Sequence, residues 1–199
     1  MVNNRVLIVV NSVYQLLTAV HMRRAVLEDR EVDLLLTDVL PKGEEYLPRL
    51  EDTGLFDRVL FARTRELNKT YAAASGEALS EVFRDIPKRF RWILSDELTY
   101  YVEIYFSNFD PFLRMLACQY YALPCEFVCY EDGFSSYVID YLREDRAPIN
   151  RHPEGRKIRD KVESVLLYEP RLAVREDGLL NRPLPKIKRQ DQELRELLN

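Results

Sequence analysis

Continuous apolar runs alternate with segments of helical spacing along the first sixty residues. Three such runs lie at residues 5–10, 32–37 and 56–61. Runs that are apolar on both faces are typical of parallel strands covered by helices on either side. Between the first two runs, apolar side chains of residues 13–29 recur near the helical period, and residues 44–53 predict a shorter helix. The pattern is therefore strand, helix, strand, helix, strand.

The alternation continues through the rest of the chain. Residues 77–94 predict a helix with a kink at Pro87, and Pro111 is suited to the first turn of another helix. Three further strands are expected at residues 103–106, 125–130 and 164–168. Repeated strand–helix–strand units predict an α/β fold, with a Rossmann-like, mostly parallel sheet and helices on both of its faces.

The last third of the chain contains the weakest patterns. Residues 143–161 are rich in charge and predict a surface loop, or a loop followed by a short helix. Residues 182–186 predict an extended connector, and residues 190–198 a short helix. We therefore expect a Rossmann-like domain over residues 1–180, with residues 181–199 forming a connector and the start of a further, C-terminal domain.

Composition narrows the class of protein. A chain of 199 residues, 47% hydrophobic and 31% charged, is typical of one globular domain. Its net charge of −4 argues against a general nucleic-acid binder, and no apolar run is long enough to cross a bilayer. The three cysteines favour reduced thiols over disulfides, and their spacing lacks the ligand pairs of a zinc site. A cytoplasmic protein is expected.

Two adjacent acids follow the predicted strand at residues 125–130. Glu131 and Asp132 are followed by Gly133, and ligands of open α/β sheets bind just beyond the carboxyl ends of strands. Carboxylates in that position are candidates for general-base catalysis or for holding a polar substrate. The alternative is a surface turn with Asp132-Gly133 at its corner, which local sequence alone favours.

Other polar side chains are expected at the same edge of the sheet. The candidates that follow predicted strands are Asn11, Ser12, Gln15, Ser107, Asn108, Ser135, Ser136 and Tyr137. Simpler roles stay open for several of them. Ser12 is favoured as a helix cap, Ser107 and Asn108 are equally suited to capping, and Gln15 is equally suited to a solvated helical turn.

These motifs resemble a known family of enzymes. The strand followed by residues 11–17 is similar to the opening of the bacterial lipooligosaccharide sialyltransferases, glycosyltransferase family 52. Residues 130–133, with the hydroxyl side chains after them, resemble the acid-acid-glycine motif that these enzymes share with bacterial polysialyltransferases. Residues 166–170 resemble the strand that closes the first domain. The tripeptide alone is a poor signature, because residues 176–178 repeat it.

The resemblance implies the N-terminal, acceptor-side half of a GT-B glycosyltransferase. The missing C-terminal domain would bind CMP-sialic acid as donor, without a cofactor or a metal, and the acceptor would be a cell-surface glycan. Asp132 would be the catalytic base, Glu131 would orient it or contact the acceptor, and Gly133 would let the backbone approach the sugar. The isolated chain would be inactive. Association with the inner face of the membrane and a homodimer stay open.

His152-Pro153 is similar to a His-Pro pair that meets the donor phosphate in this group of enzymes. The resemblance would make His152 a donor-binding residue. That pair is expected in the second domain, however, whereas here it lies in a charged segment. A loop histidine beside a proline is the favoured interpretation.

A second class of function stays open beside the enzyme. The chain could be a non-catalytic α/β module that binds a ligand or a protein, with Glu131 and Asp132 in a surface turn. The two hypotheses differ in one requirement. The enzyme requires the Asp132 carboxylate in a concave site near Gln15 and Asn108, whereas the module allows it to point away from both.

Overall fold

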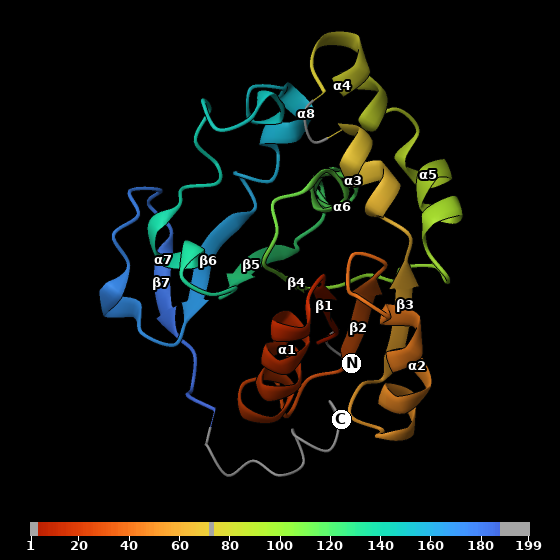
Figure 1. Ribbon diagram of the computed structural model, residues 1–199, viewed down its shortest axis with the longest axis vertical. Helices are drawn as coiled ribbons and strands as arrows, with labels where there is room; N and C mark the ends of the chain where they lie inside the picture. The colour runs from red at the N-terminus through yellow and green to blue at the C-terminus, as the bar shows by residue number, and fades with distance from the viewer. Residues whose placement is uncertain (1–3, 72–73, 188–199) are drawn as a thin grey trace.

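The computed structural model describes residues 4–71 and 74–187, which form one sheet with helices packed against it (Figure 1). All seven strands are parallel, in the order β3-β2-β1-β4-β5-β6-β7. The strands are β1 (Val6–Val10), β2 (Val32–Thr37), β3 (Arg58–Ala62), β4 (Glu103–Phe106), β5 (Glu126–Tyr130), β6 (Val162–Leu167) and β7 (Leu180–Pro183). The expected α/β, Rossmann-like fold is confirmed.

Helices cover both faces of the sheet, each over its own apolar core. One face carries α1 (Val13–Ala25) and α2 (Gly43–Asp52). The other carries α3 (Arg65–Tyr71), α4 (Gly76–Val82), α5 (Ile86–Ile93) and α6 (Pro111–Gln119). The short helices are α7 (Ser135–Val138), η1 (Pro148–Asn150), α8 (Pro153–Arg156) and η2 (Pro170–Leu172). Alternate residues of one strand, such as Ile8 and Val9, belong to different cores, which explains the continuous apolar runs.

The strand order reverses direction between β1 and β4. Chain segments that leave these neighbouring strands therefore turn to opposite sides, and the gap between them at the carboxyl edge is where ligands of such sheets bind. The β1–α1 and β4–α6 loops border this switch point, and the β5–α7 loop lies one strand further along.

Several sequence-based boundaries were wrong. The helix expected at 77–94 is two helices, because Asp85 adopts a left-handed φ of 52° and Pro87 stands in the first turn of α5. The helix expected at 13–29 ends at Ala25. Within 143–161 the structure has a loop with η1 and α8, as the second alternative allowed.

The expected C-terminal connector begins within a strand. Residues 182 and 183 belong to β7, which pairs with β6 in parallel, so the predicted domain boundary at 180 falls at the start of a strand. The helix expected at 190–198 lies outside the described residues. Cys118, Cys125 and Cys129 are free thiols, in keeping with the sequence. In the described part of the chain, no helix combines the length and apolarity needed to cross a membrane.

Candidate functional site at the carboxyl edge

Gln15 joins the three loops at the carboxyl edge of the sheet. It lies in the first turn of α1 and is 1% exposed. Its Nε2 donates to Oδ2 of Asp132 at 2.8 Å and to Oδ1 of Asn108 at 3.2 Å. Its Oε1 accepts the backbone N–H of Asn11 at 2.7 Å. Asp132 therefore lies beside Gln15 and Asn108, which is the proximity that the enzyme hypothesis requires in addition to a concave site.

Asp132 keeps one carboxylate oxygen free of the protein. The residue is half-buried, and Oδ2 is held by Gln15, whereas Oδ1 accepts no hydrogen bond from a described residue. The backbone N–H of Asp132 donates to Oγ of Ser136 at 2.8 Å, and Gly133 follows with a left-handed φ of 78°. This turn directs the Asp132 carboxylate back toward α1. Asp132 therefore lies in a turn, as one alternative expected, and also beside the candidate site residues, as the other expected.

Glu131 has a different environment from its neighbour. It is 7% exposed and accepts hydrogen bonds from the hydroxyl of Tyr14 (3.0 Å), the hydroxyl of Tyr137, and the backbone N–H of Tyr168 (2.8 Å). Burial, together with the hydrogen bond to Glu131, raises the pKa of Tyr137 to about 12, so its hydroxyl stays protonated and donating. Glu131 thus ties the β5–α7 loop to α1 and to the end of β6.

Asp110 is a third carboxylate of the edge, and the sequence did not point to it. Its Oδ1 accepts the N–H of Leu113 at 2.8 Å as the cap of α6, and Oδ2 accepts from the amides of Asn68 (3.0 Å) and Asn11 (3.3 Å). Desolvation raises the pKa of Asp110 to about 6, against the opposing effect of these donors. The Asp-Pro start of α6 signals a cap, but no local signal reveals Asn68, which comes from α3.

The remaining predicted residues of the carboxyl edge form hydrogen bonds within the protein. Ser12 caps α1, with its Oγ accepting the N–H of Gln15 at 3.1 Å. Ser107 is buried and donates to the carbonyl of Tyr130 at 2.8 Å. Oγ of Ser135 lies 3.5 Å from the carbonyl of Asp132. These hydroxyls fix the shape of the edge, and Asn11 does so as well by accepting from Thr37 at 2.6 Å.

His152 lies apart from this network. Its Nδ1 accepts the N–H of Glu154 as the cap of α8, and its ring stacks on Phe83 with 5.2 Å between centroids. Nε2 is 3.2 Å from Oγ of Ser80, on α4. None of these contacts reaches the carboxyl edge, which agrees with a histidine of structural role.

The second acid-acid-glycine copy has the same backbone shape in a different setting. Gly178 has a φ of 77°, nearly that of Gly133. Asp177, however, forms an ion pair with Arg175 at 3.4 Å, and it precedes the edge strand β7. The context after a buried strand, and not the tripeptide, distinguishes Asp132.

The start of α1 lacks a glycine-rich phosphate turn, and side chains already occupy two of the backbone N–H groups there. Dinucleotide-binding folds present free backbone N–H groups of a glycine-rich turn at this point. Here Gln15 accepts the N–H of Asn11, and Ser12 accepts that of Gln15. Among described residues, neither Glu131 nor Asp132 forms an ion pair with a cation. The edge therefore favours neutral polar groups, such as hydroxyls, over anions.

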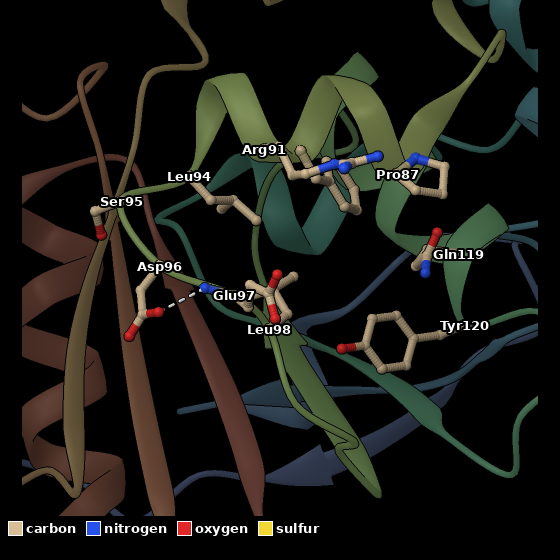
Figure 2. Close-up of a pocket in the computed structure, with 10 residues that line it drawn as sticks. Pro87, Arg91, Leu94, Ser95, Asp96, Glu97, Leu98, Gln119 and Tyr120 are labelled. Carbon is tan, nitrogen blue, oxygen red and sulfur yellow. Dashed lines mark hydrogen bonds between the residues drawn. The ribbon is translucent and has the colours of Figure 1, made fainter.

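A cavity of about 500 Å³ lies away from this network, between α5 and the end of α6 (Figure 2). The segment before β4 completes its wall; the lining residues are Pro87, Phe90, Arg91, Leu94, Ser95, Asp96, Glu97, Leu98, Gln119 and Tyr120. Asp96 is engaged by Arg58 at 2.8 Å and by the N–H of Glu97. No predicted site residue lines this cavity.

Comparisons with known proteins add no identity. The chain matches no known family model and no curated protein. In residues 4–71 and 74–187, no group of three or more histidine, cysteine or acidic side chains is arranged to hold a metal ion.

Proposed function

We propose that this chain is the acceptor-side domain of a glycosyltransferase, with Asp132 as the general base. The observation that carries the proposal is the Asp132 carboxylate, held at 2.8 Å by Gln15 at the switch point with its second oxygen unengaged. The resemblance to the lipooligosaccharide sialyltransferases supplies the reaction class and the donor, CMP-sialic acid. A second, donor-binding domain would supply the opposite wall.

The proposed reaction requires Asp132 to accept one proton from the acceptor. An acceptor hydroxyl binds at Oδ1, transfers its proton to the carboxylate, and its oxygen forms a bond to the anomeric carbon of the donor. The bond from that carbon to the phosphate oxygen breaks, and CMP leaves with the electron pair. Gln15 holds the carboxylate in place throughout, and Asn108 in turn orients the Gln15 amide.

Binding of the acceptor is the first test. We expect oligosaccharides derived from lipooligosaccharide, titrated into the chain, to shift the side-chain amide NMR signals of Gln15 and Asn108. Asp132→Asn should weaken the binding about fivefold, because one hydrogen bond to a charged group is replaced by a neutral one. Shifts confined to residues outside the carboxyl edge would contradict an acceptor site there and would favour a binding module.

Transfer of sialic acid is the second test. With a donor-binding domain present, Asp132→Asn should lower kcat by about 10² to 10⁴, the usual contribution of a general base, while the free energy of unfolding changes by less than about 0.5 kcal/mol. Asp177→Asn is the matched control, because it alters the second copy of the motif; its activity, corrected for folded protein, should be unchanged. We expect no transfer by the 199 residues alone. Full activity of Asp132→Asn would exclude the proposed base.

A further inference from the structure

Trp92 is the most unusual surface residue of α5. It is 79% exposed, and it is the only tryptophan in the chain. The helix is anchored from its other side, where Ile86 and Phe90 are buried in the core. A large exposed aromatic side chain contributes little to the packing of its own helix. Its presence there therefore indicates a contact with something outside the fold.

Positive charge gathers on the same surface. Lys88 and Arg91 are exposed on α5 and form no ion pair with any described residue; Arg91 lies on the side of the helix that also borders the α5–α6 cavity. Helices α3 and α5 together contain five basic residues and a single acid, Glu66, in a chain whose net charge is −4. Arg89 is paired with Glu81 of α4, so the excess positive charge comes from the other cations, Lys88 and Arg91 among them.

An apolar groove of about 410 Å³ separates the two helices. Leu67 and Tyr71 line it from α3, and Trp92 and Ile93 from α5. Two arginines and the acid Glu66 also line the groove. Arg63 pairs with Glu44 across exposed surface, and Arg89, which pairs with Glu81 at 3.8 Å, lies 5.9 Å from the centre of the Tyr71 ring. The groove thus offers an apolar trough with cations beside it, at the margin of the molecule where Figure 1 shows α3 and α5.

We propose that the α3–α5 surface, made by Leu67, Tyr71, Lys88, Arg91 and Trp92, binds a bilayer containing anionic phospholipid. Indole rings favour the interface between headgroups and acyl chains, and each lysine or arginine near an anionic bilayer adds attraction. A soluble polyanion would satisfy the charges but would leave the apolar trough and Trp92 in water. The bilayer satisfies both. This contact holds whether or not the chain transfers a sugar.

The lone tryptophan is also the probe for the test. The 199-residue chain is titrated with vesicles of phosphatidylcholine alone and of phosphatidylcholine with 30% phosphatidylglycerol. With the anionic vesicles we expect a blue shift of Trp92 emission, protection from acrylamide, and quenching by brominated acyl chains. The association should weaken at high salt, because part of it is electrostatic. Absence of a blue shift and of co-sedimentation with anionic vesicles would overturn the proposal.

Paired variants separate this surface from general electrostatic attraction. Lys88→Gln with Arg91→Gln should lower the partition coefficient about thirtyfold. The control, Arg151→Gln with Arg159→Gln, removes two other exposed cations that form no ion pair with a described residue, and should change the partition coefficient less than threefold. Equal losses in the two pairs would contradict a specific surface.

A second pair tests the aromatic side chain by vesicle sedimentation. Trp92→Ala should weaken binding at least tenfold, whereas Phe134→Ala, which removes an aromatic residue that is also 79% exposed, should have little effect. Both positions are exposed, so neither substitution threatens folding. Tight binding of heparin that leaves Trp92 emission unchanged and displaces the vesicles would show that a soluble polyanion is the partner, and would also overturn the proposal.

Discussion

The two edges of the sheet each hold a buried carboxylate, but its partners differ. At the amino edge, Asp33 is fully buried and pairs with Arg5 at 2.9 Å and Arg58 at 3.6 Å, while the Tyr101 hydroxyl donates to it at 2.8 Å. At the carboxyl edge, Glu131 is held by hydroxyl and amide donors alone. At the amino edge, two arginines pair with the Asp33 carboxylate. At the carboxyl edge, no described cation pairs with the Glu131 carboxylate.

Under the proposed function, this difference separates a structural edge from a catalytic one. Burial raises the pKa of Asp33 against the opposing effect of Tyr101, Arg5 and Arg58, but both of its oxygens are occupied by these partners and leave no place for a substrate. Neutral donors fix the position of a carboxylate but do not cancel its charge. At the carboxyl edge, Gln15 holds Oδ2 of Asp132 and leaves Oδ1 without a donor from the described residues, which is what the proposed general base requires.

The strongest test of the comparison is Asp33→Ala. We expect the free energy of unfolding to fall by about 3 to 5 kcal/mol, because Arg5 and Arg58 are left partly buried without their shared partner. Chemical denaturation measures the change. Asp96→Ala is the matched control, since it removes the exposed partner of the same Arg58 and should cost less than about 1 kcal/mol. Similar losses in both variants would show that burial does not distinguish the pairs.

Removal of the Glu131 carboxylate should have the next largest effect. Glu131→Ala leaves the Tyr137 hydroxyl and the Tyr168 N–H without an acceptor, and should lower the free energy of unfolding by about 2 to 3 kcal/mol. Tyr14→Phe, the control, removes only a donor that is half-exposed, and should cost less than about 1 kcal/mol. A loss below that value for Glu131→Ala would mean that these hydrogen bonds do not hold the edge together.

The smallest expected effect is a dependence of stability on pH. The pKa of Asp110 is raised from its usual 3.8 to about 6 in the folded chain, so the folded state binds this proton more tightly than the unfolded state. The contribution of Asp110 to the free energy of unfolding is therefore fully present below about pH 4. It is lost as the pH rises to about 6, by about 1 to 3 kcal/mol.

Asp110→Asn isolates this contribution. Asparagine still caps a helix, so α6 should be retained. The difference in unfolding free energy between the native chain and the variant, measured by denaturation from pH 4 to 7, should change over that window. For Asp145→Asn the difference should be nearly flat over the same window, because the hydrogen bond from Arg143 lowers the pKa of Asp145 and the group is ionised in both states above about pH 4. A difference that is flat from pH 4 to 7 for Asp110→Asn would contradict a raised pKa.

Local sequence was sufficient for much of the fold. The apolar runs located the first six strands, and the residues of β2 and β4 were predicted without error. It was also sufficient for the cap at Ser12, because an N-cap depends only on the residues that follow it. It failed at residues 77–94, where the left-handed Asp85 interrupts an otherwise helical pattern, and at β7, whose four residues are all exposed. An exposed edge strand carries no apolar signal.

The sequence by itself determined which side chains end each strand, since the order of apolar and polar residues is a local property. The tertiary structure decided which of those side chains meet. Gln15 and Asp132 are 117 residues apart and touch only because β1, β4 and β5 are neighbours in the sheet. Asp110 and Asn68 joined the network for the same reason, and Glu131 turned inward while Asp132 did not. Hydrogen bonds and burial between distant segments depend on strand order, which emerges only when the whole core packs.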